Sequence, residues 1–141
     1  MRALGVDYGR KRVGLAISDP TGTLATPLET LTRRAGKRPP VAALSRVAER
    51  EGVDHLVVGL PLELDGQEND WCREVREFGD SLAARLDLPL TFIDERLSSV
   101  RAEDAIRSAG GSRALHKDRG RIDAAAAAVI LQCFLDGEAG R

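Results

Sequence analysis

The sequence predicts a single α/β domain in which helices cover both faces of a five-stranded mixed sheet. The first observation is a pair of short apolar runs, residues 3–8 and 13–18, joined by a turn that contains Gly9. The second is a later alternation of helical and extended patterns, typical of parallel strands joined by helical crossovers. The third is size, because 141 residues suit one hydrophobic core. We therefore assign residues 1–137 to one domain and residues 138–141 to a short polar tail.

The first three strands are expected to pair as an antiparallel meander. Residues 3–8 and 13–18 combine apolar residues with glycine and predict a hairpin, and a turn at residues 19–22 follows. Residues 24–31 predict a weaker third strand. Pro27 places that strand at the edge of the sheet, because proline cannot donate to a strand ladder.

Helices and strands alternate in the middle of the chain. After a basic loop at residues 33–40, apolar residues recur at helical spacing from Val41, and Gly52 is suited to end that helix. Residues 55–60 form a nearly continuous apolar run, typical of a strand covered on both faces. The next helix has an apolar stripe at intervals of three or four residues that predicts its core-facing side. This stripe consists of Trp71, Val75, Phe78, Leu82 and Leu86.

The last third of the chain predicts one more strand and two helices. Residues 90–93 predict the fifth strand, with two acidic residues immediately after it. Residues 98–109 predict a helix that a serine can cap and that a glycine pair ends. A basic loop at residues 112–121 precedes the final helix, residues 122–135. The alanines of that helix would let it approach a sheet closely.

The composition excludes several classes of protein. With 43% hydrophobic and 30% charged residues, the chain has ordinary globular values and is not a disordered segment. No apolar run reaches the ~20 residues of a membrane span, and no secretory signal is recognisable, so we expect a cytoplasmic protein without a membrane partner. Two cysteines and two histidines without metal-ligand spacing argue against a disulfide framework or a structural zinc site.

Positive charge gathers in three short windows, although the formal net charge is −1. Such an uneven distribution suits a polyanion, such as nucleic acid, that is bound on one face. For any single window, a solvated surface loop is an equally good interpretation. The windows contain Arg10, Lys11 and Arg12; Arg33, Arg34, Lys37 and Arg38; and Arg113, Lys117, Arg119 and Arg121.

Acidic residues at the ends of predicted core elements indicate a metal site. Asp7 lies inside an apolar strand, where an ionised carboxylate is costly unless a cation compensates it. Asp94 and Glu95 follow a second strand, and Asp123 begins the last helix. Carboxylates from three separate elements at one sheet edge would form a hard oxygen site suited to Mg²⁺ or Mn²⁺. Two such ions can promote phosphodiester hydrolysis.

Two of these acids have alternative interpretations. Asp123 could complement the dipole of the last helix, an interaction worth about 0.3–1 kcal/mol. Glu95 could form a surface ion pair with Arg96, which contributes little to stability. For Asp7, a role other than metal binding is the hardest to argue, since its strand is otherwise apolar.

Four segments resemble a known family in the order expected of it. They are Gly5 to Asp19, residues 58–66, residues 94–99, and the stretch from Lys117 and Asp118 to Ala126. Together they resemble the YqgF/RuvX family of Holliday junction resolvases and pre-16S rRNA nucleases, and the match runs essentially end to end. The resemblance implies a ribonuclease H-like fold and metal-dependent cleavage of nucleic acid by a two-metal-ion hydrolase.

The resemblance also assigns roles to individual residues. Asp7, Glu95 and Asp123 would be the catalytic metal ligands, with Mg²⁺ or Mn²⁺ as cofactor. If the strand before Glu95 is not adjacent to the first strand, Glu95 must reach across about two strand spacings, roughly 9–10 Å. Asp94, Glu63 and Asp65 remain alternatives to Glu95. Phosphate contacts are expected from basic residues near these acids, namely Arg10, Lys11, Arg12, Arg96, Lys117, Arg119 and Arg121.

Several functions remain open at this point. The first is processing of the 5′ end of pre-16S rRNA, and the rival substrate is a four-way DNA junction, which usually requires a symmetric dimer. Whether the protein is a monomer or a homodimer is not determined by the sequence. A second class is a nucleic-acid-binding module without catalysis. A third is a nucleotide phosphatase or kinase of the actin-like type, which is disfavoured because those proteins pair two such domains.

Overall fold

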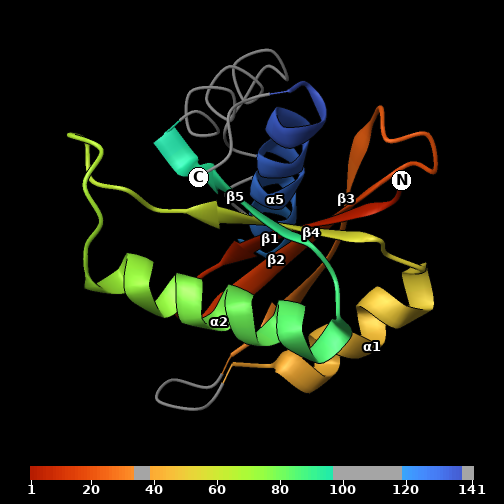
Figure 1. The fold of residues 1–141 in the computed structure, drawn as a ribbon, viewed down its shortest axis with the longest axis horizontal. Helices are drawn as coiled ribbons and strands as arrows, with labels where there is room; N and C mark the ends of the chain where they lie inside the picture. Colours follow the sequence, from red (N-terminus) through yellow and green to blue (C-terminus); the bar gives the residue numbers. More distant parts are fainter. Residues whose placement is uncertain (34–38, 97–118, 138–141) are drawn as a thin grey trace.

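The computed structural model describes residues 1–33, 39–96 and 119–137, without the side chains of residues 119–121. Its centre is a five-stranded sheet with strand order β3-β2-β1-β4-β5. Helices α1 and α2 cover one face of the sheet and α5 covers the other (Figure 1). The strands are β1 (Ala3–Tyr8), β2 (Arg12–Ser18), β3 (Ala25–Thr32), β4 (His55–Leu60) and β5 (Leu90–Asp94). The helices are α1 (Val41–Glu51), α2 (Asp70–Leu86) and α5 (Arg119–Leu135).

Strand pairing confirms the predicted mixed sheet. β1 pairs antiparallel with β2, and β2 pairs antiparallel with β3. β4 lies parallel to β1 on one side and to β5 on the other. β3 is at the edge, as Pro27 predicted, and the register of its pairing shifts between Leu15 and Ala16. The carboxyl ends of β1, β4 and β5 therefore meet at one edge of the sheet.

Some expected boundaries differ. The last helix begins at Arg119 rather than at residue 122, because its first turn is polar and carries no apolar periodicity. The helix expected at residues 98–109 lies outside the described residues, as do most of the basic loop before α5 and the tail at 138–141. Among the helices that the structure describes, none is long and apolar enough to cross a membrane.

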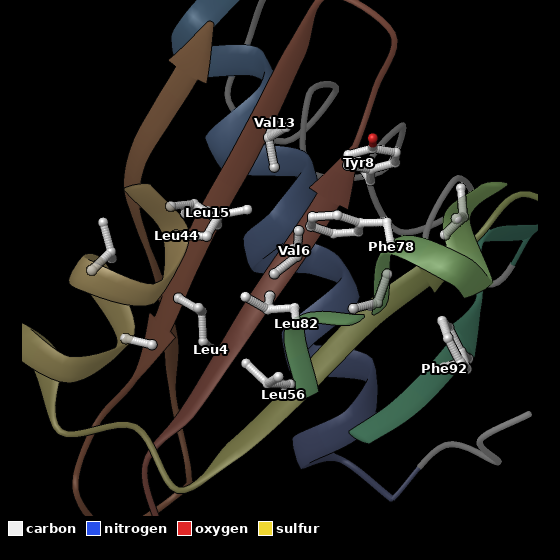
Figure 2. Close-up of a cluster of buried hydrophobic side chains, with 14 of the residues drawn as sticks. Leu4, Val6, Tyr8, Val13, Leu15, Leu44, Leu56, Phe78, Leu82 and Phe92 are labelled. Carbon is white, nitrogen blue, oxygen red and sulfur yellow. The ribbon is translucent and has the colours of Figure 1, made fainter. Parts of the chain in front are cut away.

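The two faces of the sheet are packed differently. Large side chains fill the space between the sheet and helices α1 and α2, including Phe78 and Leu82 of the predicted stripe (Figure 2). Val75 of the same stripe is also buried there. Smaller residues dominate the α5 face, where Ala3, Ala16 and Ala127 are fully buried. α5 therefore lies close to the strands, as its alanines predicted.

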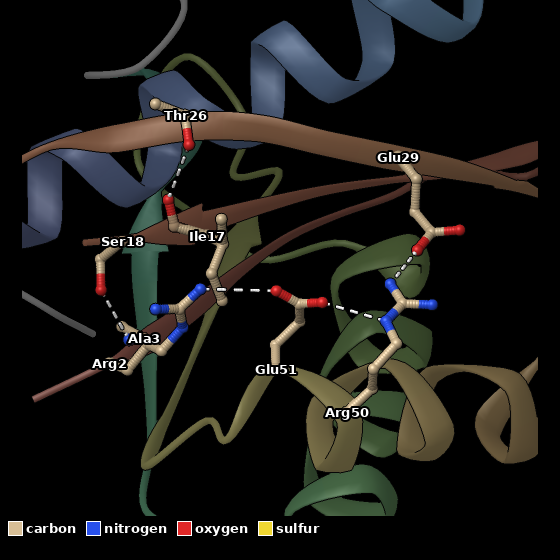
Figure 3. A network of polar contacts seen from close by, with 8 residues as sticks. All are labelled: Arg2, Ala3, Ile17, Ser18, Thr26, Glu29, Arg50 and Glu51. Atoms are coloured by element: carbon tan, nitrogen blue, oxygen red, sulfur yellow. Dashed lines mark hydrogen bonds and ion pairs between the residues drawn. The ribbon is translucent and has the colours of Figure 1, made fainter. Parts of the chain in front are cut away.

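A polar network joins the amino-terminal part of the sheet to α1 (Figure 3). Glu51 accepts hydrogen bonds from Arg2 at 3.4 Å and from Arg50 at 3.0 Å, and Arg50 also donates to Glu29 on β3 at 2.7 Å. The buried Ser18 hydroxyl accepts a bond from the Ala3 amide at 2.7 Å. The exposed ion pairs contribute little stability, whereas the buried bond satisfies the first amide of β1.

Gly14 on β2 marks the closest approach of α5 to the sheet. A Cβ atom at this position would lie 2.0 Å from the backbone oxygen of Asp123 and 3.0 Å from the Ala124 nitrogen. No side-chain movement can relieve an overlap with backbone atoms. Only glycine at this position permits α5 to bring Asp123 to its place.

We therefore expect Gly14→Ala to lower the free energy of unfolding by at least about 3 kcal/mol, the upper end of overpacking effects. Urea denaturation would measure this change. Gly79→Ala is the matched control, because its Cβ would meet side-chain atoms rather than backbone, namely the Phe92 ring at 3.0 Å and Leu90 Cδ2 at 3.4 Å, and because helix α2 gains propensity. Equal stability losses for the two variants would contradict this account of α5 packing.

Candidate active site

Asp7 points towards the α5 side of the sheet. Leu4, Val6 and Tyr8 of β1 belong to the core beneath α1 and α2, and side chains alternate along a strand. Asp7 therefore shares the opposite face with Ala3 and projects beside α5 near the carboxyl end of β1. This is the edge at which the parallel strands end.

Glu95 reaches Asp7 by crossing β4. It directly follows β5, which is separated from β1 by one strand, β4. The Glu95 side chain must therefore span two strand spacings to reach Asp7, as the sequence analysis considered. A Cβ atom built on Gly59 of β4 would lie 2.7 Å from Glu95 Oε1 and 2.9 Å from its Cγ. The Glu95 side chain therefore lies over Gly59, and its carboxyl group is hydrogen-bonded to that of Asp7.

Both carboxyl groups hold protons more tightly than usual. Burial is the main cause and raises the pKa of Asp7 to about 6 and that of Glu95 to about 8. The charge of Asp123 adds to the effect at Asp7, and the charges of Asp7 and Asp94 add to it at Glu95. The hydrogen bond favours a protonated Glu95 that donates to an ionised Asp7. Without a cation, the pair thus shares a proton at neutral pH.

Asp123 lies beside this pair, and its carboxylate forms an ion pair with Arg12. Arg12 Nε at the start of β2 donates to Asp123 Oδ2 at 2.5 Å. Asp123 is the fifth residue of α5, and no acid occupies the first turn of that helix. The dipole interpretation of Asp123 is therefore weakened, because the dipole effect falls off within the first turn.

The donor set suits a hard divalent cation, although the carboxylates are not gathered around one point. Within the described residues, no three carboxylate, thiol or imidazole groups stand close enough together to hold one ion as they are. Asp7 and Glu95 form the close pair, and Asp123 contributes its charge from beside it. A divalent cation would replace the shared proton and offset both the desolvation and the repulsion that raise the two pKa values.

The alternatives to Glu95 bond elsewhere. Arg96 donates to both carboxylate oxygens of Asp94 and also to the Leu64 carbonyl at 3.1 Å. Glu63 accepts from the Asn69 side chain at 2.7 Å, and Asp65 accepts from the amide of Gln67 at 3.0 Å. Glu95 is thus the residue that the fold brings to Asp7. Arg96, which was expected to contact phosphate, is hydrogen-bonded to Asp94 and to the loop after β4.

Basic residues border the carboxylates on the turn between β1 and β2. Lys11 is exposed, and the exposed Arg10 lies over the Trp71 ring with its Cζ 4.1 Å from the centroid. Arg12 is the partner of Asp123, and Arg33 donates to the Gly9 carbonyl at 2.8 Å. The other residues expected to contact phosphate lie outside the part of the chain that the structure describes. They are Lys117 and the side chains of Arg119 and Arg121. The same holds for Arg34, Lys37, Arg38 and Arg113.

Two residues that position the site were not predicted from the sequence. Gly59 makes room for Glu95, and Gly14 makes room for the backbone at Asp123. An isolated glycine in an otherwise apolar strand is a known signal of close approach by another group, and Gly59 carries that signal. Arg12 was predicted as a phosphate contact, and its bond to Asp123 was not foreseen.

Comparison with known proteins identifies the family to which the chain is similar. The profile of a family described as "RuvX: Holliday junction resolvase" matches residues 1–137. A protein of Anaeromyxobacter dehalogenans is 46% identical, covering 99% of both chains, and one of Thermosynechococcus vestitus is 44% identical, covering 94% of this chain and 86% of the other. Both carry the name "Putative pre-16S rRNA nuclease".

Solved structures show the same fold at low sequence identity. RuvC of T. thermophilus in complex with Holliday junction substrate has a TM-score of 0.60 at 16% identity, covering 96% of this chain and 93% of that one. The fowlpox virus resolvase bound to Holliday junction DNA has a TM-score of 0.57 at 12% identity, covering 96% and 97%. The fold is therefore ribonuclease H-like, as the resemblance implied.

Gly59→Ala should displace Glu95 from Asp7. The new methyl group would also meet Ile130 Cδ1 at 2.6 Å, so the single variant is expected to lose stability as well. The double variant Gly59→Ala, Ile130→Val removes that second obstacle and should recover most of the stability without restoring the carboxyl pair. The measurement is thermal unfolding with and without Mg²⁺. We expect Mg²⁺ to raise the unfolding temperature of the native protein and to leave that of the double variant unchanged. An undiminished response would contradict the proposed path of Glu95.

The raised pKa values predict an inverse dependence of stability on pH in the metal-free protein. Between the unfolded pKa values near 4 and the folded values of about 6 and about 8, the folded state binds more protons than the unfolded state. The contribution of this pair to the free energy of unfolding therefore falls as pH rises from about 5 to about 8. Denaturation of Glu95→Gln and of native protein in EDTA would measure it, and Glu95→Gln should flatten the profile.

Proposed function

We propose that this chain, which belongs to the RuvX family, is a metal-dependent nuclease that hydrolyses phosphodiester bonds. The observation that carries the proposal is the half-buried carboxyl pair Asp7 and Glu95, with Asp123 beside it, at the carboxyl ends of the parallel strands. Such a pair is electrostatically costly without a cation. Perturbed carboxyl groups that gather at a strand edge are typical of a catalytic site.

Asp7 and Glu95 would hold Mg²⁺ or Mn²⁺ between them after losing their shared proton. Such ions supply an activated water and stabilise the leaving oxygen in a phosphodiester displacement. Asp123 would complete the oxygen ligands from the α5 side, which requires Arg12 to release or share the Asp123 carboxylate. The freed guanidinium would then lie beside the metal site, where it can donate to a substrate phosphate.

Precursor 16S rRNA, cut at its 5′ end, is the proposed substrate. The names of the relatives that match nearly the full chain support this choice. Processing of ribosomal RNA also fits the cytoplasmic location expected from the sequence. Arg10 and Lys11 on the exposed turn after β1 would contact phosphates rather than bases, so binding should weaken steeply with salt.

A four-way DNA junction is the second candidate substrate, because the family description names Holliday junction resolvase. Symmetric cleavage of a junction calls for two active sites in one assembly. The solution state of the protein, monomer or homodimer, therefore bears directly on this alternative. A protein that stays monomeric on the junction would not support it.

Asp7→Asn should abolish cleavage and preserve nucleic-acid binding. Changing only the outer-shell partners of a metal ligand costs about 10- to 100-fold, so loss of a ligand should cost at least about 100-fold. The assay is cleavage of labelled pre-16S RNA and of a four-way DNA junction with Mg²⁺, Mn²⁺ or EDTA. Binding is measured separately by gel shift.

Asp80→Asn is the matched control for this substitution. Asp80 is an exposed acid on α2, across the sheet from the carboxyl pair. This variant should cleave like the native protein. Unchanged cleavage by Asp7→Asn, or full activity in EDTA, would contradict the proposed metal site.

A further inference from the structure

Arg96 makes its polar contacts within the chain. Its Nε atom donates to Asp94 Oδ1 at 3.0 Å and to Oδ2 at 2.9 Å, and its Nη2 also donates to Oδ2. The Arg96 amide donates to the same Oδ1 at 2.9 Å. Its Nη1 donates to the Leu64 carbonyl at 3.1 Å. A guanidinium that forks on a carboxylate in this way forms a strong ion pair with a specific geometry.

Asp94 anchors this ion pair in the sheet. It is the last residue of β5, is only 6% exposed, and pairs with Leu60 at the end of β4. A buried carboxylate is costly unless a cation and hydrogen bonds compensate it, and Arg96 supplies both. The ion pair is therefore held more firmly than an exposed pair on the surface.

The loop after β4 holds the other side of the Arg96 guanidinium. The loop is ordered by its own backbone, since the Gly66 amide donates to the Glu63 carbonyl at 2.8 Å and the Glu63 amide to the Gln67 carbonyl at 2.9 Å. A Cβ atom built on Gly66 would lie 3.3 Å from Arg96 Nη1, so the guanidinium lies against this loop. Arg96 thus ties the chain after β5 to the loop after β4.

The ion pair and the Glu95 carboxyl group lie on opposite faces of the sheet. On β5, Phe92 packs in the core beneath α1 and α2, and Ile93 packs beneath α5. Because side chains alternate along a strand, Asp94 projects to the side of α1 and α2. Glu95 crosses β4 on the α5 side. Arg96 therefore forms its ion pair on the face opposite to the proposed metal site.

Glu95 needs a backbone that is held in place. β5 ends at Asp94, so the ladder between β4 and β5 stops one residue before Glu95. The Glu95 side chain nevertheless spans two strand spacings to reach Asp7. Fixing a long side chain on an unrestrained backbone costs conformational entropy. The contacts of residues 94 and 96 enclose Glu95 and restrict its backbone before a metal ion binds.

We propose that Arg96 is a positioning residue of the nuclease and not a phosphate contact, an inference that rests on the proposed function. Through its fork on Asp94 and its bond to the Leu64 carbonyl, Arg96 fixes the backbone of Glu95 and holds the Glu95 carboxylate ready for the metal ion. Groups that orient a metal ligand from outside its coordination shell typically account for about 10- to 100-fold in metal affinity or activity.

Mg²⁺ binding, measured by thermal unfolding at increasing Mg²⁺ concentration, tests this role. Arg96→Gln removes a positive charge near the proposed metal site, which by charge alone should strengthen cation binding. Loss of positioning predicts the opposite. Arg96→Lys keeps the charge but cannot form the fork. Both variants should need at least about tenfold more Mg²⁺ than the native protein for the same rise in unfolding temperature.

Arg76→Gln is the matched control for these substitutions. Arg76 on α2 forms a comparable fork on Glu68, with distances of 2.7 and 2.8 Å. This variant should respond to Mg²⁺ like the native protein. Each response is measured from the unfolding temperature of the same variant in EDTA, so that a loss of stability is not counted as a loss of metal binding.

RNA binding is measured separately, by gel shift with labelled pre-16S RNA in EDTA. A positioning residue leaves this affinity unchanged, whereas loss of a phosphate contact weakens it and reduces the salt slope by about one. Weaker RNA binding by either Arg96 variant would overturn the assignment, as would a Mg²⁺ response equal to that of Arg76→Gln. If the Arg96 variants behave like the native protein while Asp7→Asn still abolishes cleavage, the nuclease proposal stands and only the role of Arg96 is wrong.

Discussion

The close approach of two half-buried carboxyl groups is the constraint on which the site depends. Asp7 lies on β1 and Glu95 directly follows β5, which is not a neighbour of β1, yet their side chains meet and are partly desolvated. Folding can tolerate this meeting only with a shared proton or a cation between them. In the proposed metal site, the desolvation and repulsion that burden the metal-free fold would instead favour a bound divalent ion. The stability of the domain and its chemistry are therefore linked at one point.

Close packing of α5 on the sheet brings a third carboxylate, Asp123, beside this pair. The helix has no bulky residue where it crosses Gly14, so its backbone lies against β2 and fixes Asp123 beside Arg12. Because Gly59 has no side chain, the Glu95 side chain can cross β4 at this position. On the opposite face, large side chains anchor α1 and α2 and keep the sheet rigid. Small residues on the α5 face thus allow a helix and a glutamate side chain to approach the strands closely, whereas large residues on the other face fill the core beneath α1 and α2.

The sequence predicted most of this architecture because its elements are strongly patterned. The hairpin, the apolar run of β4, the stripe of α2 and the edge position of Pro27 were all confirmed. Family resemblance identified Glu95, whose approach to Asp7 depends on the strand order. The bonds from Arg12 to Asp123 and from Arg96 to Asp94 were not predictable, because surface arginines have many possible partners. The stacking of Tyr8 on Trp71 and Phe78 was not predicted, because the sequence placed only Trp71 and Phe78 on the core-facing side of their helix.

The bond between Arg12 and Asp123 joins residues separated by 111 positions in the chain. During translation, at about 5–20 residues per second, the hairpin that contains Asp7 emerges roughly ten seconds before α5 does. The third carboxylate can dock only after nearly the whole domain has been synthesised. In the proposed nuclease, a partly synthesised domain would therefore lack the third acid of its metal site, and cleavage would wait for the completed fold.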